Sequence, residues 1–439
     1  MGFFKKDHAG SVMIIESERL FRGEMLGIFP RYVFKSRWKR WVMMLLDLGG
    51  YILVFPFSLF RKKVSSDCFR RILVIRLDHI GDVTMTKPAL EALCRAFPTS
   101  EIDLLVSHEI KPLFEDSRGI RQVIGMDDHW FSRQSNLGKR VRSFIRAASM
   151  IRKKNYDLAI DFRGDLRNIL LMFSSGIPYR LGYAETGGGF LLTEKGNYSR
   201  DLHQMGLNLR LLERFGVNPN SMESPYTYSQ EKKERFWRSF GSVLEPKEKL
   251  RIVIHPYAGY PSKEWPHENY ETLIDRMVGE GVGQVVVIGS ERDKMRYPLH
   301  GFNGKAIVDL RGKTRLEDLP ILFDHCDLFI GNDSGPSHLA AAQGIPCVCL
   351  FSGTNPWQAW HPVSRKLYLL SHTVSCSPCE EKTCPLGHHD CMNKMTVDEV
   401  VEKVRLALGS KDHPSMGSGA SGSQSRANPA KEYLSSREA

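Results

Sequence analysis

The sequence predicts an α/β protein built from two doubly wound domains, and three observations support this fold class. Short β-branched runs alternate with longer amphipathic stretches from residue 71, stop at a polar stretch near residue 220, and then begin again. A chain of 439 residues also exceeds what one hydrophobic core usually supports. With 42% hydrophobic and 25% charged residues, the composition is that of a globular protein, which excludes disordered and fibrous classes.

The first 70 residues form a basic and apolar N-terminal extension. Residues 1–71 contain fourteen Lys/Arg against six Asp/Glu, a net charge of +8 within a chain total of +11. A basic excess confined to this region favours an anionic membrane surface as partner. Nucleic acid is disfavoured as a partner, because aromatic residues are not interleaved with basic ones outside the apolar segment.

Residues 41–60 are apolar enough to enter a membrane, but they include Asp47, a Gly pair and Pro56. Basic clusters flank the segment on both sides, which favours a hairpin-like or interface-lying anchor over a simple spanning helix. The alternative is a helix packed on the globular body, since a charge at Asp47 is costly in lipid. No secretory leader is apparent, so we expect a reducing, cytoplasmic compartment.

The two domains and their connections follow from the positions of the predicted strands. Helical periodicity separates the strands, and Gly216 ends the last helix of the first domain. The predicted boundaries are 71–225 for the first domain, 226–249 for a linker, 250–408 for the second domain and 409–439 for a disordered Gly/Ser-rich tail. The predicted strands are 71–77, 101–106, 122–126 and 156–162, followed by 251–256, 284–290, 306–310, 327–333 and 346–352.

The stretch D-L-F-I-G-N-D-S-G-P-S-H-L-A-A-A, residues 327–342, predicts an anion site where a strand meets a helix. Asp333 lies at the carboxyl end of the strand, Ser334 is suited to cap the helix, Gly335 permits close approach, and Pro336 suits the first turn. The N–H groups of that turn favour a phosphate. The alternative is a well-capped helix without a ligand.

Two loops of the second domain add charged groups at the carboxyl ends of neighbouring strands. Residues 255–266, H-P-Y-A-G-Y-P-S-K-E-W-P, contain a flexible Ala258-Gly259 turn and Lys263, which is suited to a pyrophosphate. Glu291 follows the next strand and is placed to accept ribose hydroxyls. Either charge alone would more commonly be a solvated loop residue. Together with Asp333 they predict a nucleotide pocket.

In the first domain, R-L-D-H-I-G-D-V-T places Asp78 and Asp82 at a strand-to-helix turn with Gly81 between them. A carboxylate there could take the proton of an acceptor hydroxyl, although Asp82 also suits a helix N-cap. The stretch is not G-x-G-x-x-G, so the dinucleotide fingerprint is missing.

Basic residues also follow the strand at 156–162. In D-F-R-G-D-L-R, Arg163 and Arg167 are suited to bind carboxylate or phosphate groups of a ligand, with surface solvation as the alternative. His203 and Asn208 open the helix before the linker and receive no chemical role.

The late cysteines have the spacing of metal ligands. Cys376 and Cys379 form a C-x-x-C pair, and Cys384 and Cys391 follow with two histidines between them. Four thiolates would make a closed structural zinc site, while free thiols or disulfides are the alternatives.

Four motifs in order resemble glycosyltransferase family 9, the bacterial lipopolysaccharide heptosyltransferases. The motifs are I-R-L-x-x-I-G-D, H-P-x-A-G-x-x-x-K-x-W-P, G-N-D-S-G-P-S-H-L-A-A-A and C-x-P-C-x-x-x-x-C, and the resemblance covers about residues 71–408. It implies the GT-B architecture, in which two Rossmann-like domains face a central cleft. The N-terminal domain would bind the acceptor and the C-terminal domain the nucleotide-sugar donor.

The resemblance implies roles for individual residues. Asp82 matches the general base, Lys263 the lysine on the donor phosphate, and Glu291 the acid on the ribose. Asp78 departs from the family pattern, which has a small polar residue there. The remaining donor-site matches are Ala258, Gly259, Asp333, Ser334, Gly335 and His338.

The reaction implied is an inverting transfer of a heptose-like sugar from a nucleoside diphosphate, ADP above all, to a lipopolysaccharide core or other lipid-linked saccharide. It requires no metal or other cofactor, and the expected location is the cytoplasmic face of the bacterial inner membrane. The alternatives are a family member with another donor or acceptor, and a catalytically silent, membrane-held nucleotide-sugar binding protein.

Overall fold

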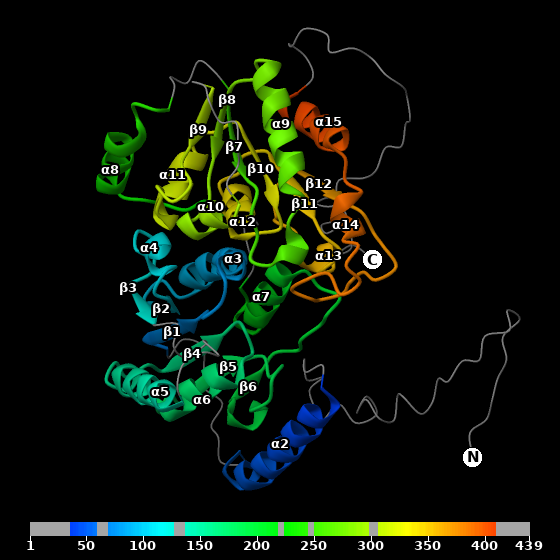
Figure 1. Cartoon of the computed structure of the whole chain (residues 1–439). Helices are drawn as coiled ribbons and strands as arrows, with labels where there is room; N and C mark the ends of the chain where they lie inside the picture. Colours follow the sequence, from blue (N-terminus) through cyan, green and yellow to red (C-terminus); the bar gives the residue numbers. More distant parts are fainter. Residues whose placement is uncertain are drawn as a thin grey trace, which may run out of the picture. The chain divides into compact units, whose positions relative to one another are not determined.

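The computed structural model describes residues 36–58, 69–126, 137–217, 224–244, 250–297 and 306–409. These residues form two six-stranded sheets with helices packed against them (Figure 1). The strand pairs run parallel in both sheets. The α/β prediction is therefore confirmed.

The first sheet has the strand order β3-β2-β1-β4-β5-β6. Its strands are β1 (Arg71–Ile75), β2 (Glu101–Ser107), β3 (Gln122–Met126), β4 (Leu158–Asp161), β5 (Tyr179–Gly182) and β6 (Glu194–Lys195). The second sheet has the order β12-β11-β10-β7-β8-β9. Its strands are β7 (Arg251–His255), β8 (Gln284–Val287), β9 (Ile307–Asp309), β10 (Leu328–Asn332), β11 (Cys347–Phe351) and β12 (Leu367–Ser371). In both sheets the order reverses beside the first strand, which is where doubly wound folds bind ligands.

The helices connect the strands as the periodicity predicts. In chain order the α-helices are α2 (Arg37–Ser58), α3 (Ile80–Ala96), α4 (Lys111–Phe114), α5 (Leu137–Arg152), α6 (Leu166–Ser174), α7 (Gln204–Leu212), α8 (Gln230–Phe240), α9 (His267–Gly279), α10 (Glu291–Arg296), α11 (Leu319–Phe323), α12 (Gly335–Ala342), α13 (Trp357–Trp360), α14 (Asp390–Asn393) and α15 (Val397–Leu408). Short 3-10 turns are η3 (Gly189–Leu191), η4 (Glu213–Phe215), η5 (Pro261–Lys263) and η6 (Leu316–Asp318). As predicted, Gly216 ends the α7–η4 segment, with φ at 67°.

The chain divides by packing into two compact units that do not follow chain order. Unit 1 contains the described residues within Met1–Arg76, Thr99–Asp103 and Asp128–Tyr198. Unit 2 contains Leu77–Pro98, Leu104–Asp127 and Ser199–Ala439, so α3 belongs with the second sheet. The boundaries expected from chain order, 71–225 and 250–408, divide the chain differently from these packing units. They stay a prediction.

The core of unit 2 explains why its central strands read as continuous apolar runs. Every residue of β7, β10 and β11 is buried, as expected for parallel strands covered on both faces. Trp265 and Tyr270 lie in this core with their rings 4.9 Å apart. The strands are therefore held rigidly, and their carboxyl ends present loops in fixed positions.

Three strands were not predicted from the sequence. β6 has only two residues and β5 has four, and β5 includes the buried Arg180. The Arg180 guanidinium donates to the carbonyls of Ile177, Pro178 and Leu191, contacts that appear only when the chain folds. β12 pairs only with β11 at the edge of its sheet.

Residues 41–58 of the apolar segment lie in one continuous helix, α2, rather than a hairpin, and residues 59–60 lie outside the described residues. Within the described residues, no helix combines the length and the apolar run needed to cross a bilayer. Asp47 faces the protein and is fully buried. Part of the packed-helix alternative is thus observed, because one face of α2 contacts η3.

Candidate active site

Lys263 and Asp333 form an ion pair at the carboxyl ends of β7 and β10. These strands are neighbours, so the chain leaves them at the same edge of the second sheet. Lys263 ends η5, and its Nζ lies 2.5 Å from Oδ2 of Asp333. The side chains are only 15% and 5% exposed. The structure therefore brings together the two charges that the sequence assigned to one anion site.

Asn332, the last residue of β10, ties the Lys263 loop to this edge. Its Oδ1 accepts hydrogen bonds from the backbone N–H of Trp265 (3.1 Å) and from the Tyr270 hydroxyl (3.0 Å). Its Nδ2 donates to the Pro256 carbonyl at 3.0 Å. The side chain is fully buried and bonded through both polar atoms, as buried amides require. Sequence reasoning missed Asn332, although its position beside Asp333 was visible.

Asp333 is held ionised by its neighbours. His338 places Nε2 3.6 Å from Oδ1, and Lys263 occupies the other oxygen. Burial would raise the pKa of Asp333, but the His338 side chain and the Lys263 ammonium together hold that pKa below its ordinary value. The site is thus a buried carboxylate between two cationic or proton-donating groups.

α12 begins directly after Asp333 with Ser334 as its N-cap, but the cap differs from the prediction. Ser334 makes no side-chain bond to the helix N–H groups. Its Oγ instead lies 3.2 Å from Nδ1 of His255 and 3.3 Å from Oγ of Ser337. Pro336 is in the first turn, as predicted. The Ser334 side chain therefore accepts no hydrogen bond from the first backbone N–H groups of α12.

The first turns of α3 and α12 pack so closely that two glycines are required. A Cβ on Gly335 would lie 2.8 Å from Cβ of Ile80, and one on Gly81 would lie 2.8 Å from Cδ2 of His338. Real Cβ atoms do not approach this closely. The turn that carries Asp82 therefore lies against the helix that follows Asp333.

Asp82 is the third residue of α3 and is half-buried. It is not the N-cap, a position occupied by His79 without a side-chain bond. A carboxylate in the first turn is stabilised in its charged form by the helix dipole, and the charged form is the one that accepts a proton. Asp78 lies just before the helix, where its Oδ1 accepts the His79 N–H at 3.0 Å.

Glu264 shapes the Ala258-Gly259 turn, a role that sequence reasoning did not assign. Its Oε1 accepts the Ala258 N–H at 3.0 Å and pairs with Arg296. Nothing lies within 4 Å of the position of a Cβ on Gly259. The backbone of this turn is thus fixed at Ala258 and open to a ligand at Gly259.

Glu291 is exposed at the start of α10, where Ser290 and Asp293 form a capping box. A Cβ on Gly312 would lie 1.9 Å from its Oε2, so Glu291 lies directly over that glycine. Gly312 also has a φ of 72°, which favours glycine. The structure therefore places Glu291 shortly after β8, as the sequence predicts.

The cysteine-rich segment 376–391 buttresses the turn that carries Lys263. Ser262 donates its N–H to the Lys382 carbonyl (3.1 Å) and its hydroxyl to the Glu381 carbonyl (2.6 Å). The Ser262 carbonyl lies 3.2 Å from Thr354 Oγ1 and 3.0 Å from His389 Nε2. Four contacts on one residue fix the backbone next to Lys263.

The cysteines themselves are free thiols in the structure. Burial raises the pKa of Cys391, and its neighbours Cys376, Cys379 and Cys384 add to that rise. Cys384 accepts the His389 N–H at 3.3 Å, and backbone N–H groups outweigh desolvation to lower its pKa. Among the residues described, no three or more His, Cys, Asp or Glu side chains are arranged to hold a metal ion. Within this part of the chain, the structure therefore does not show the predicted zinc site.

His203 and Asn208, left without a role at the sequence level, anchor α7. Asn208 donates to the Met85 carbonyl (3.1 Å) and to Thr86 Oγ1 (3.2 Å), which holds α7 against α3. His203 Nδ1 accepts the Met205 N–H, so its Nε2 carries the proton that bonds the His361 carbonyl at 2.9 Å. Burial lowers the pKa of His203 to about 3. Neither residue left a motif in the sequence.

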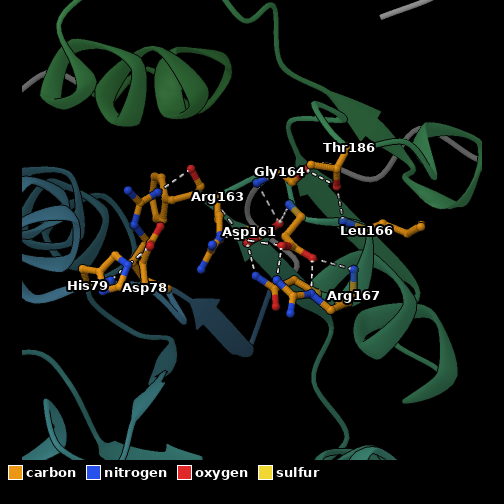
Figure 2. Close-up of polar contacts among 12 residues, drawn as sticks. Asp78, His79, Asp161, Arg163, Gly164, Leu166, Arg167 and Thr186 are labelled. Atoms are coloured by element: carbon orange, nitrogen blue, oxygen red, sulfur yellow. Dashed lines mark hydrogen bonds and ion pairs between the residues drawn. The ribbon is translucent and has the colours of Figure 1, made fainter. Parts of the chain in front are cut away.

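Arg163 and Arg167 both pair with Asp165 in the loop after β4. Figure 2 labels the two arginines. Arg167 makes two contacts, at 2.8 and 2.6 Å, whereas Arg163 lies 3.7 Å away. Burial opposes ionisation of Asp165, but Arg167 dominates and lowers the Asp165 pKa. The guanidinium groups predicted to bind an acidic acceptor are thus held by an internal carboxylate, and each keeps about 30% of its surface exposed.

Asp161 shapes this loop and was not singled out. Its carboxylate accepts the N–H groups of Arg163, Gly164 and Asp165 and the Asn168 amide, as Figure 2 shows in part. Full burial raises the pKa of Asp161 to about 6. The loop conformation is therefore set by one buried acid at the carboxyl end of β4.

Comparison with known proteins matches this chain to heptosyltransferases. The model of glycosyltransferase family 9 (heptosyltransferase) matches residues 144–389, more than half of the chain. Lipooligosaccharide heptosyltransferase 2 of Campylobacter jejuni subsp. jejuni serotype O:2 is 36% identical over 340 residues, which is 75% of this chain and 95% of the relative. Lipopolysaccharide heptosyltransferase 3 of Escherichia coli (strain K12) is 26% identical over 294 residues, 64% of this chain and 82% of the relative.

A solved structure shows the same fold. The structure of E. coli ADP-heptose LPS heptosyltransferase II has a TM-score of 0.63 and 23% identity, covering 77% of this chain and 98% of that chain. The two parallel six-stranded sheets are accordingly GT-B-like. With its family match, its curated relatives and this fold, the chain belongs to glycosyltransferase family 9, the heptosyltransferase family, and is a glycosyltransferase.

Proposed function

We propose that the protein transfers a heptose from ADP-heptose, with inversion, to a saccharide of the lipopolysaccharide core or another lipid-linked acceptor. The names of its relatives support this donor and acceptor, since they are lipopolysaccharide and lipooligosaccharide heptosyltransferases. The neighbouring structure is that of an ADP-heptose enzyme. No metal or other cofactor takes part in the proposed reaction.

The observation that carries the proposal is the buried Lys263–Asp333 pair beside the first turns of α12 and α3. An ammonium and an uncapped helix N-terminus at one edge of a sheet suit a diphosphate. Ala258, Gly259, Ser334, Gly335 and His338 would complete the donor site, with Glu291 on the ribose.

Asp82 would act as the general base. It takes the proton of the acceptor hydroxyl as that oxygen attacks the anomeric carbon, and the bond from this carbon to the β-phosphate oxygen breaks. Lys263 and the α12 N-terminus offset the charge that grows on the departing ADP. The products are the glycosylated acceptor, ADP and one proton, initially on Asp82.

Asp78, Arg163 and Arg167 are proposed to contact the acceptor. The exposed surface of the two guanidinium groups would meet acidic groups of the saccharide. A lipid-linked acceptor places the reaction at the cytoplasmic face of the bacterial inner membrane. The N-terminal extension would hold the enzyme there.

The test is transfer by the purified full chain from a panel of nucleotide sugars to a heptose-deficient lipopolysaccharide, followed by product mass and ADP release. We expect ADP-heptose to be the best donor. Asp82→Asn should lower kcat by about 100-fold to 10,000-fold and leave ADP affinity unchanged, because proton transfer is lost and donor contacts are kept.

The matched control is Glu402→Gln, an exposed carboxylate on α15, which should keep wild-type turnover. Transfer by Asp82→Asn at the wild-type rate would refute the assigned base. Transfer from a different nucleotide sugar alone would refute the donor, and donor binding without any turnover would identify a silent binding protein.

A further inference from the structure

α2 exposes an unusual amount of apolar surface. Eight of the 16 large apolar side chains that are exposed among the described residues belong to this one helix. The most exposed is Leu53, at 75% of its surface. These eight residues are Trp38, Trp41, Val42, Leu45, Leu46, Leu48, Ile52 and Leu53. Apolar patches of this kind on a folded protein mark interaction sites.

The opposite face of α2 is fixed to unit 1 by polar and aromatic contacts. The Asp47 carboxylate accepts the Gly188 N–H at 2.8 Å and is fully buried. Tyr51 stacks edge-on against Phe190 with the ring centroids 6.1 Å apart, and its hydroxyl accepts a hydrogen bond from Lys195 at 2.7 Å. The only charge between residues 41 and 54 thus points into the protein. Asp47 therefore places no charge on the exposed face, where it would oppose contact with lipid.

The charges near this exposed face are basic. Lys39 and Arg40 are exposed in the first turn of α2, next to Trp38 and Trp41. Tryptophan and basic residues together are typical of the lipid–water interface. Residues 1–71 carry a net charge of +8.

A second helix of the same unit adds to this charge. α5 contains five Lys/Arg and no acid, and its exposed side includes Arg142 and Arg146 beside Val141 and Ile145. α6 packs against both α5 and η3, and η3 packs against α2. Figure 1 shows α5 and α6 side by side. Unit 1 is thus basic where it is also apolar, which is complementary to anionic lipid and not to a neutral apolar partner.

We propose that α2 lies in the plane of an anionic lipid bilayer, with its exposed apolar face among the acyl chains and its Asp47 face on the protein. The in-plane orientation follows from the Asp47 contact. In a helix standing upright across the bilayer, Asp47 and the loop bonded to it would lie in hydrocarbon, which is strongly unfavourable. A helix on its side keeps these groups at the interface.

This inference deepens the proposed function, because a lipid-linked acceptor would be reached from a membrane-bound enzyme. Vesicle binding is measured without donor or acceptor. Failure of the sugar transfer and failure of the docking surface are therefore separate results.

The first experiment measures flotation of the full chain with phosphatidylcholine vesicles that contain no anionic lipid or about 30% phosphatidylglycerol. We expect binding to the anionic vesicles, weakened when salt shortens the Debye length from about 10 Å to about 3 Å. The variant Leu45→Gln/Ile52→Gln/Leu53→Gln should bind at least about tenfold more weakly, because it loses most of the inserted apolar area.

The controls separate insertion from loss of fold. Val243→Gln/Leu406→Gln replaces two equally apolar, exposed side chains of unit 2 and should bind like wild type. The α2 variant should keep the wild-type melting temperature, since its three side chains are exposed. Asp47→Ala should keep vesicle binding and lower the melting temperature, because the Gly188 N–H loses its acceptor.

The second experiment tests the orientation by fluorescence quenching with lipids brominated at shallow or deep positions. Trp41 is measured in a Trp38→Phe chain. It is compared with the tryptophan introduced by Leu53→Trp in a Trp38→Phe/Trp41→Phe chain. The two should show the same depth, whereas an upright helix would separate them by about 18 Å.

Three results would overturn the proposal. One is equal binding by the α2 variant and wild type. Another is different depths for the two tryptophans. The third is absence of vesicle binding together with a dimer that the α2 variant dissociates, which would identify a second copy as the partner of this face.

Discussion

At the scale of single residues, Lys263 and Asp333 depend on each other. Both are largely buried, so each charge has lost most of its hydration and is compensated by the other. Removing one partner leaves an uncompensated charge, whereas removing both leaves none. The pair also occupies the proposed phosphate position, so its effects on stability and on donor binding can be separated.

We predict that Lys263→Met lowers the melting temperature and raises the KM for the donor by about tenfold or more, because Asp333 is left buried and the phosphate loses its ammonium. The double variant Lys263→Met/Asp333→Asn should recover the melting temperature and not the donor KM. Scanning calorimetry and steady-state kinetics check the two effects. A double variant less stable than Lys263→Met would contradict this account.

His203 makes stability depend on pH. Its Nδ1 must stay unprotonated to accept the Met205 N–H, and burial lowers its pKa from 6.5 to about 3. The unfolded chain therefore binds the proton first as pH falls. The stability from neutral His203 is fully present above pH 6.5 and is lost as pH decreases from there toward the folded-state value.

For His203→Asn, we predict a smaller loss of stability on acidification. Between pH 7.5 and 5.5 this one group accounts for about 1.4 kcal/mol of unfolding free energy in the wild type, and asparagine caps the helix without titrating. Melting temperatures at the two pH values give the comparison. The half-exposed His372→Asn is the control, and equal acid sensitivity of His203→Asn and wild type would rule the explanation out.

At the scale of elements, the cysteine-rich segment contacts the proposed donor site through Ser262. The segment is held to Gly353 and Thr354 by the backbone N–H groups of Cys379 and Glu380, and it contacts Ser262 by backbone carbonyls and His389. This segment, which has no regular structure before α14, thereby supports η5. Its spacing suggests metal ligands, but its observed contacts are those of a positioning element.

We predict that His389→Ala raises the KM for the donor about threefold to tenfold with little change in kcat, because one hydrogen bond that holds the Lys263 turn is lost. His389→Gln should restore most of the affinity. His388→Ala, which removes the neighbouring exposed histidine that contacts Asp390, is the matched control. Equal kinetics for the two alanine variants would argue against a positioning role.

At the scale of the whole molecule, the proposed base and the proposed donor site belong to one compact unit. α3 comes from the N-terminal half of the chain, yet it packs with α12 and α7 in unit 2. Asn208 and the two tight glycine contacts hold this arrangement. Ligand binding at Lys263 should thus also stabilise the first turn of α3.

We predict that saturating ADP slows amide hydrogen exchange in residues 256–263, in the first turn of α12 and in the first turn of α3, while α5 and α6 of unit 1 are unaffected. Lys263→Met at the same ADP concentration is the control and should show weaker protection, because its affinity for ADP is lower. Protection limited to α12, with α3 unchanged, would show that the two first turns are not coupled.

Much of the fold could be predicted from the sequence. Nine strands alternate with helices because buried parallel strands need continuous β-branched runs and their connecting helices need a 3.6-residue period. β5, β6 and β12 could not be predicted. β6 has too few residues for a pattern, and Arg180 in β5 is buried only because carbonyls from two loops surround it.

The candidate site divides in the same way. Lys263, Asp333 and Gly335 stand at strand ends and helix starts, positions whose chemistry is local and readable. Asn332 and His203 were missed because they have partners far along the chain, up to 158 residues away for His203. Asp161 and Glu264 were missed because they accept backbone N–H groups, which any residue supplies. A side chain chosen for such a partner leaves no periodic signal.

The sequence by itself determined most of the strand-and-helix order, the charged residues at the loop ends, and the basic, apolar nature of the extension, because each depends on residues close in the chain. Only the tertiary structure decided that Asp47 points inward, that the cysteine-rich segment supports Ser262 through Glu381, Lys382 and His389, and that α3 packs on α12. These outcomes depend on which distant groups meet, and the hydrogen bonds and tight contacts between them form only when the backbone has folded.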